Sequence, residues 1–442
     1  MDAGGTEAVV YVIVVLLILA FFLGSGMWIF AGLLMVSAVS LMVLLDMSIF
    51  RVGSILRGNM WAKACSWELA CIPLFVWMGE LLFRTDISDR LFSGLRPWVS
   101  WLPGRLLHTN VFGCALFAAV SGSSTATTAT IGKITTVTLI DRGYDEKLAI
   151  GSVAGAGTLG LLIPPSIVMI VYGIIVEQSV ARLFAAGLLP GLMVAGLYSA
   201  YIVIRALMNP NVAGIKDKSY TARDFLHSLA DLAPILVLMP IVLGGIYSGI
   251  ATPTEAAALG VFGALLILLL TGQFVWKIVF ESLMGAVRIT CMVVTIVVAA
   301  SFMSTAMGYL HVPQEISAGI AYLELGRYEL LFILFLFYIV LGLFLEGISI
   351  MVMSLPITYP LILEHGFDPI WFGVFLVITV ELAQVTPPVG LNLYVLQGLT
   401  GRSIGHVAVA AFPFFLLLCL GALIITIFPE IALWLPNQLI TK

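Results

Sequence analysis

The sequence predicts an all-α polytopic membrane protein with two inverted structural repeats, each containing a re-entrant helical hairpin and a proline-broken helix. Three observations point to this fold class. Of the 442 residues, 61% are hydrophobic and only 10% are charged. Several apolar runs reach the ~20 residues that a helix needs to cross a bilayer, whereas a β-barrel would show shorter segments of alternating polarity. Finally, landmark residues recur along the chain at a fixed separation.

The composition also excludes some functions. A net charge of −4 without a basic cluster gives no support to nucleic-acid binding. The five cysteines lie in or beside apolar segments and form no CxxC pair, so we expect core thiols instead of a disulfide framework or a metal site. Asp2 and Glu7 stand where a cleaved signal would be basic, and we expect the first apolar run to stay in the protein.

The landmark residues recur with a separation of 223 residues. The segment RGYDEKLAIG at 142–151 resembles HGFDPIWFGV at 365–374. A Pro-Pro pair follows each segment, at 164–165 and 387–388, in the same register. Because independent matches share one register, the chain is predicted to contain a duplicated half, as many secondary transporters do.

The repeat divides the chain into a first repeat at 1–206, a hydrophilic linker at 207–231 and a second repeat at 232–442. Each repeat is expected to contain one or two spans, a re-entrant hairpin, a broken helix and a closing span. The hairpins are predicted at 110–138 and 329–364, and the broken helices at 145–176 and 368–398.

The first hairpin is predicted from AAVSGSSTATTATIGK at 118–133, since small hydroxyl residues have no use on a lipid-facing surface. Its tip is placed at 121–124. The repeat places the second tip at 344–347 (FLEG), where a charge and a glycine interrupt an apolar run. One such stretch alone favours tight helix packing, and one Pro-Pro pair favours a kink. Because both features occur twice in register, a transport site is the favoured interpretation.

The two Pro-Pro pairs are expected to interrupt their helices and to leave carbonyl groups without intrahelical donors. In hydrocarbon such groups persist only where protein, water or ions satisfy them. Unwound carbonyls coordinate sodium in transporters. The hairpin tips add hydroxyl oxygens and glycine backbone, so the sequence predicts binding of an ion and an anionic substrate.

Ionisable residues inside spans are functional by default. Lys133 follows the first tip and is interpreted either as a contact for an anionic substrate or as a lysine that extends to the membrane interface. Glu346, at the second tip, is the stronger candidate for a functional charge. Further acidic residues in or beside apolar segments are Glu80, Glu255 and Glu381.

Several segments together resemble a known family. SGSSTATTATIGK, LLIPPSIVMIVYGIIVEQS, ATPTEAAALG at 251–260 and VTPPVGLNLYV at 385–395 resemble the large membrane subunit of tripartite ATP-independent periplasmic (TRAP) transporters, over essentially the whole chain. The resemblance implies a transporter and not an enzyme: a sodium-driven importer of an organic acid or related solute, in the bacterial inner membrane, with an elevator mechanism. It also implies a periplasmic substrate-binding protein and a small membrane subunit, expected as a separate chain because no small-subunit segment precedes residue 1.

The resemblance further implies two or more sodium ions (Na⁺), bound where each hairpin tip meets its broken helix. The ligands of the first site would be Ser121, Ser124, Gly160, Ile163 and Pro165. Those of the second site would be Gly347, Ala383, Thr386 and Val389. Ala383 stands where a glycine is expected, which a carbonyl ligand tolerates. The candidate substrate contacts are Ser123, Thr125, Ser166 and Lys133.

Two other functions stay open from the sequence. A stand-alone sodium–anion symporter of similar fold would work without a binding protein. An intramembrane serine protease would use a serine of the first tip, but it needs a histidine or lysine base within hydrogen-bond reach. His108 is expected in a polar turn at the interface, and a protease gives no reason for the duplicated Pro-Pro breaks.

Overall fold

The computed structural model describes residues 14–214 except 16, 20 and 23, residues 220–316, and residues 326–439 except 344 and 389. Within these ranges the chain is helical, and its one isolated β-bridge joins Tyr144 and Ala213. Seven described helices are long and apolar enough to cross a membrane, and a bent helix pair adds an eighth. The predicted class of an all-α polytopic membrane protein is therefore confirmed.

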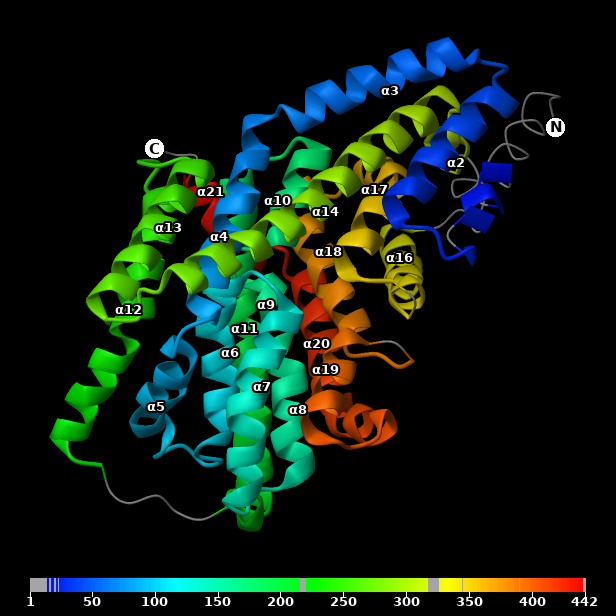
Figure 1. Ribbon diagram of the computed structural model, residues 1–442. Coiled ribbons are helices and arrows are strands. Elements are labelled where there is room, and N and C mark those ends of the chain that lie inside the picture. The colour runs from blue at the N-terminus through cyan, green and yellow to red at the C-terminus, as the bar shows by residue number, and fades with distance from the viewer. Residues whose placement is uncertain are drawn as a thin grey trace.

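The helices fall into two comparable halves (Figure 1). Those of the first half are α2 (Ile29–Leu44), α3 (Ile49–Ala64), α4 (Cys71–Phe83), α5 (Ile87–Val99), α6 (Leu107–Ser121), α7 (Ser124–Asp141), α8 (Glu146–Gly157), α9 (Leu159–Leu162), α10 (Ile167–Val176) and α11 (Val180–Met208). Those of the second half are α12 (Ala222–Tyr247), α13 (Pro253–Leu270), α14 (Trp276–Tyr309), α16 (Arg327–Gly342), α17 (Gly347–Glu364), α18 (Pro369–Gln384), α19 (Leu391–Thr400), α20 (Ile404–Ile427) and α21 (Glu430–Leu439).

The two halves run in opposite directions. In Figure 1, α8, α9 and α10 rise through the molecule, whereas α18 and α19 descend beside them. Each of these broken helices follows a hairpin, α6–α7 or α16–α17, and precedes a long helix, α11 or α20. The same order of elements in opposite directions is the inverted repeat that the sequence predicts.

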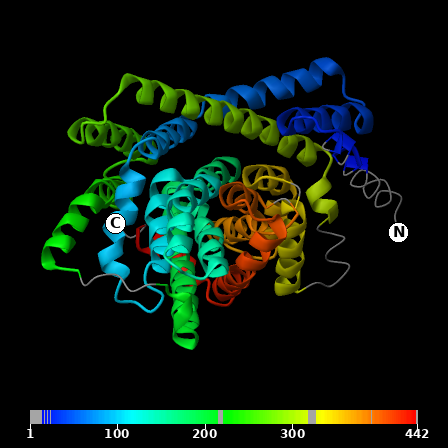
Figure 2. The same cartoon turned by 60° about the horizontal axis from the view of Figure 1, so that its bottom comes forward.

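The helices pack into two groups. The outer group consists of α2, α3, α4, α12, α13 and α14, in which α4 packs against both α13 and α14, α2 and α3 pack against α14, and α12 packs against α13. The inner group consists of the two hairpins, the two broken helices, α11 and α20. Its segment Glu146–Val176 is almost wholly buried. Figure 2 shows α3 and α14 of the outer group crossing one side of the inner group.

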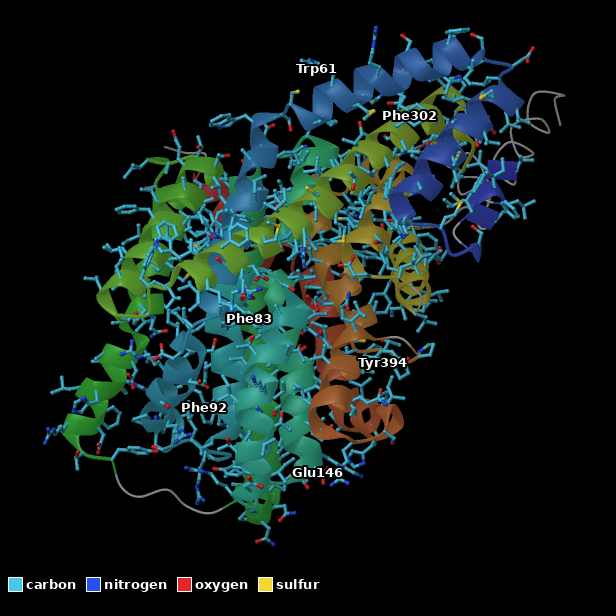
Figure 3. The ribbon with its side chains drawn as sticks, viewed as in Figure 1. Trp61, Phe83, Phe92, Glu146, Phe302 and Tyr394 are labelled. Carbon is cyan, nitrogen blue, oxygen red and sulfur yellow. The ribbon has the colours of Figure 1, made fainter. Side chains whose placement is uncertain are left out.

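Helix α3 lies across the top of the molecule in Figure 1 and is bent by 54° against the segment that follows it. Val52 is its one buried residue, whereas Phe50 and Trp61 are exposed; Trp61 is labelled in Figure 3. Exposed aromatic rings beside the basic Arg51 and Arg57 are typical of a helix that lies in the membrane interface.

The linker between the halves is shorter than predicted. Helix α12 begins at Ala222, inside the polar range 207–231. It begins there because the Asp224 carboxylate accepts a 2.7 Å hydrogen bond from the Thr221 amide, which is one half of a capping box. The first turns of α12 are polar because they are largely exposed, so polar composition alone placed the boundary too late.

Candidate functional site

The first hairpin turns at Gly122 and Ser123, between α6 and α7. Gly122 has a φ of 58°, and a Cβ atom there would lie 2.9 Å from the Pro165 carbonyl oxygen. The turn therefore needs glycine both for its backbone conformation and for its close approach to the first Pro-Pro break. The Ser123 hydroxyl accepts a 3.4 Å hydrogen bond from the Ala126 amide and so caps α7.

The first break separates α9 from α10 and contains Pro164 and Pro165. In an uninterrupted helix the amide of residue 164 would bond to the Gly160 carbonyl, but proline has no N–H. A Cβ atom on Gly160 would lie 2.6 Å from the Ser123 carbonyl oxygen, so its backbone packs directly on the hairpin tip. The break and the tip together form one oxygen-rich contact.

The second break repeats this arrangement between α18 and α19. Pro387 removes the donor that the Ala383 carbonyl would have in a helix, and the Thr386 amide donates to that carbonyl instead, at 3.2 Å. Gly347 begins α17, and a Cβ atom there would lie 2.7 Å from Val380 Cγ1. By the repeat separation, Gly347 corresponds to Ser124 and Val380 corresponds to Gly157. Those two residues also contact each other, since the Ser124 hydroxyl donates a 3.0 Å hydrogen bond to the Gly157 carbonyl. The Pro-Pro peptide bond is cis in both breaks.

The residues predicted for the first sodium site lie at the first tip and break. Gly160 packs on the tip, the Pro165 carbonyl faces Gly122, and the Ser124 side chain is buried. Ser121 ends α6, and its hydroxyl is hydrogen-bonded within the tip. Ile163 follows α9 in an extended conformation.

The described residues predicted for the second sodium site lie at the second tip, on α18 and in the break that follows it. The Thr386 hydroxyl donates a 2.6 Å hydrogen bond to the Leu382 carbonyl, which leaves its oxygen lone pairs for another partner. Ala383 packs against Gly342 in the other arm of the hairpin. Val389 lies outside the described residues.

A cavity of about 990 Å³ separates the two groups of helices at the level of both tips. Its inner wall contains residues 121–126 of the first hairpin, Glu346 of the second hairpin and Gln384 of α18. Its outer wall includes Glu80 and Phe83 of α4, together with residues of α14. Phe83 is labelled in Figure 3. A solute in this cavity would contact both hairpins and the outer group.

The candidate substrate contacts do not all reach this cavity. Ser123 and Thr125 line it, with their hydroxyl oxygens 3.2 Å apart. Ser166 is fully buried elsewhere, where its hydroxyl caps α10 by accepting a 3.4 Å hydrogen bond from the Met169 amide. Lys133 is exposed on α7 and does not line the cavity, which favours a lysine that extends away from the site.

The charged side chains of the cavity are two carboxylates. Glu80 is paired, since its Oε2 atom lies 3.2 Å from Nε of Arg84, which also contacts Glu281 at 3.1 Å. Glu346 precedes α17, and the Ser349 hydroxyl donates to it at 3.5 Å. Among the described residues Glu346 forms no ion pair. Its carboxylate is therefore the charge of the inner wall available to a ligand.

Two residues of the second half contact Ser124, of which the sequence analysis named Glu381 only as an acidic residue of an apolar segment and did not name Asn392. The Glu381 Oε2 atom lies 2.9 Å from the Ser124 hydroxyl, and the Asn392 side-chain amide donates to that hydroxyl at 2.8 Å. Both side chains are fully buried. A carboxylate in an apolar segment just before the break was a visible signal for Glu381. Asn392 gave none, because an asparagine near a helix start usually serves as a cap.

The described residues around the first tip do not provide the geometry that protease chemistry needs. A serine nucleophile needs a base within hydrogen-bond reach. Instead, the His108 ring lies at the opposite end of α6, where its nitrogens contact the Pro103 carbonyl and the Ser199 hydroxyl, each at 2.8 Å. The described hydrogen bonds of the tip serines include no histidine or lysine.

Comparison with known proteins gives a match to a protein family. Residues 10–431 match the family described as "Tripartite ATP-independent periplasmic transporter, DctM component". The chain is 35% identical to the C4-dicarboxylate TRAP transporter large permease protein DctM of Pseudomonas aeruginosa, over 84% of this chain and 87% of that protein. It is 30% identical to the ectoine/5-hydroxyectoine TRAP transporter large permease protein UehC of Ruegeria pomeroyi, over 85% and 87%.

A further relative is the sialic acid TRAP transporter permease protein SiaT of Haemophilus influenzae, which is 28% identical over 85% of this chain and 61% of that protein. Among solved structures, the YdaH transporter of Alcanivorax borkumensis superimposes with a TM-score of 0.58 and 16% identity, covering 88% of this chain and 89% of that one. This structural likeness concerns the fold alone.

Proposed function

Because the chain belongs to the DctM family of tripartite ATP-independent periplasmic transporter components, we propose that it imports an organic acid or related small solute together with sodium. Its relatives are named transporter permeases, and the chain is a large permease subunit, not an enzyme. It resides in the bacterial inner membrane, receives its solute from a periplasmic substrate-binding protein and works with a small membrane subunit.

The observation that supports this proposal best is that both hairpin tips and both Pro-Pro breaks meet beside one cavity. The Gly160 carbonyl has lost its helical donor and needs another partner within a membrane, whereas the Ala383 carbonyl accepts a 3.2 Å hydrogen bond from the Thr386 amide and keeps a lone pair for an ion. The nearby hydroxyls of Ser124 and Thr386 add oxygen atoms. A set of neutral oxygen ligands suits the sodium ion, which in this proposal is transported together with the solute.

The proposed movement is that of an elevator. The inner group carries the tips and breaks, so it contains all the ion-binding residues proposed above. The cavity lies where this group faces the outer group. Moving the inner group as one body keeps each tip on its break, whereas separating tip from break would expose unsatisfied carbonyls.

Removing one hydroxyl ligand is expected to weaken sodium binding. Ser124→Ala and Thr386→Ala should each lose ~1–3 kcal/mol, the range for a polar group that loses its partner. The measurement is the sodium concentration that gives half-maximal uptake in proteoliposomes. Thr135→Val is the matched control, because that buried hydroxyl bonds only to Ile131 of its own helix at 2.8 Å. Unchanged half-saturation in both alanine variants would show that the sites lie elsewhere.

Uptake is expected to require the substrate-binding protein. The two membrane subunits are reconstituted together, and uptake is measured with and without the binding protein encoded beside them, whose solute is first identified by thermal shift. The proposal predicts uptake only when the binding protein is present. Equal uptake without it would favour a stand-alone sodium–anion symporter instead.

A further inference from the structure

The hydroxyl of Ser124 joins the two halves of the chain. It lies 3.0 Å from the Gly157 carbonyl oxygen of its own half. From the second half, Glu381 Oε2 lies at 2.9 Å and the side-chain amide of Asn392 at 2.8 Å. These two residues flank the second Pro-Pro break, one on α18 and the other on α19. The first hairpin tip is thus attached to both sides of the opposite break.

The chemistry of these partners fixes how the hydroxyl is oriented. A serine hydroxyl has one proton and two lone pairs. The proton faces two acceptors, the Gly157 carbonyl and the Glu381 carboxyl, while the Asn392 amide takes one lone pair. No described residue takes the other lone pair, so it is available to an ion. Losing either second-half residue would remove one of the three contacts that restrict the rotation of the hydroxyl.

The same cluster contains further oxygen atoms without partners. Glu381 Oε1, Asn392 Oδ1 and Gln384 Oε1 are buried, and none of them has a hydrogen-bond partner among the residues that the structure describes. Buried oxygens of this kind are unusual in a folded protein and mark a site where a ligand, ion or water belongs. Glu381 and Asn392 contact Ser124 directly, and Gln384 lines the same cavity as Ser124.

The contact is absent from the symmetry-related position. The repeat separation relates Ser124 to Gly347, Glu381 to Thr158 and Asn392 to Met169. Glycine has no hydroxyl to orient, and methionine has no amide to donate. The first ion site therefore receives polar side chains from the second half, whereas the second site receives no equivalent set from the first half.

We propose that Glu381 and Asn392 are positioning residues that hold the Ser124 hydroxyl in its ion-binding orientation, so that the first sodium site is completed by the second half of the chain. This inference rests on the sodium coupling proposed above. It assigns the two residues a role through Ser124 and not through contact with the solute.

The test measures sodium binding in two ways on the purified complex of the two membrane subunits. One readout is the sodium concentration that half-saturates the rise in thermal midpoint, with potassium keeping the ionic strength constant; a ligand that binds only the folded state raises this midpoint. The other is the sodium half-saturation of uptake. The variants are Glu381→Leu, Glu381→Gln and Asn392→Leu, each also combined with Ser124→Ala. Thr379→Val is the control, since that buried hydroxyl of α18 bonds only to its own helix.

The leucine variants are expected to raise the sodium half-saturation at least tenfold in both readouts. Glu381→Gln keeps a hydrogen-bonding group of the same shape and should stay within threefold of the wild type, as should Thr379→Val. Combined with Ser124→Ala, neither leucine variant should add a further effect. If Glu381→Leu fails to fold, Asn392→Leu tests the same contact from the other side.

Three results would overturn the inference: unchanged half-saturation in the folded leucine variants, effects that add fully to that of Ser124→Ala, or a Glu381→Gln variant as impaired as Glu381→Leu. The last would mean that the carboxylate acts by charge. A wild-type complex that shows no sodium response in either readout would instead refute the proposed function itself.

Discussion

A reducible cross-link between positions 63 and 177 is expected to abolish uptake, and reductant is expected to restore it. Lys63 lies in the last turn of α3, in the outer group, and Glu177 follows α10, in the inner group. The Lys63 ammonium lies 3.2 Å from the Glu177 carboxylate and 3.3 Å from the Ile174 carbonyl. This pair therefore joins the two bodies that an elevator must slide past each other.

The native ion pair would not prevent the proposed movement. The Glu177 side chain is 82% exposed, and exposed ion pairs contribute little, of the order of 0–1 kcal/mol. A covalent bridge, unlike an exposed ion pair, does not break during the movement. Lys63→Cys and Glu177→Cys, joined by a bifunctional disulfide-forming reagent, should hold the protein in the conformation described here and stop transport.

The matched control is an ion pair inside the inner group. Arg402 Nη2 lies 3.0 Å from Glu146 Oε2, and Glu146, at the start of α8, is labelled in Figure 3. A cross-link between positions 146 and 402 joins two parts of the inner group, which is proposed to move as one body, and should leave uptake intact. Both double variants are made after replacing the native cysteines, which are Cys65, Cys71, Cys114, Cys291 and Cys419.

Uptake that persists with the 63–177 cross-link in place would contradict an elevator and fit rocking or local gating instead. Loss of uptake with the 146–402 cross-link would also contradict it, because the inner group would then have to deform during transport. The measured quantity in each case is the initial uptake rate before and after reduction, together with the cross-linked fraction on a gel.

The positions of the tips and breaks were predictable because glycine and proline act through the backbone. Gly122 is needed for a left-handed turn, and each Pro-Pro pair removes helical donors wherever it stands. These effects depend on a few neighbouring residues, so they are visible in the sequence. The shared register then related one half to the other without any knowledge of the packing.

The contacts of Ser124 were not predictable in this way. Glu381 is 257 residues away in the chain and Asn392 is 268 residues away. Which side chain contacts the Ser124 hydroxyl depends on how the two halves pack. No repeat or hydrophobic pattern in the sequence indicates that packing. Lys133 also shows that nearness in sequence does not determine nearness in the folded chain. It is near the tip in sequence, but its position on α7 directs it away from the cavity.

The start of α12 is marked in the sequence by a capping box, but the prediction followed the polar composition of the segment instead. The polar composition of 207–231 favoured a linker over its whole length. Thr221 and Asp224 have the spacing of a capping box, which starts a helix whatever the polarity of the residues that follow. Local capping chemistry decided this boundary, and average composition did not.

Replacing sodium by potassium is expected to abolish uptake altogether. Two oxygen-rich contacts, one at each hairpin tip, contain backbone carbonyls whose helical donors proline has removed. Potassium is larger than sodium and does not suit the close approach of the Gly160 backbone to the first tip. Because two or more ions are proposed to bind together with the solute, the uptake rate should rise sigmoidally with sodium concentration.

The most direct test of this coupling is the initial rate of solute uptake into proteoliposomes that contain both membrane subunits, with the loaded binding protein outside. The rate is measured under an inward sodium gradient, with potassium in place of sodium, and under a proton gradient alone. Sodium-coupled transport predicts uptake only under the sodium gradient, with a Hill coefficient above one. Equal uptake driven by the proton gradient in the absence of sodium would contradict it.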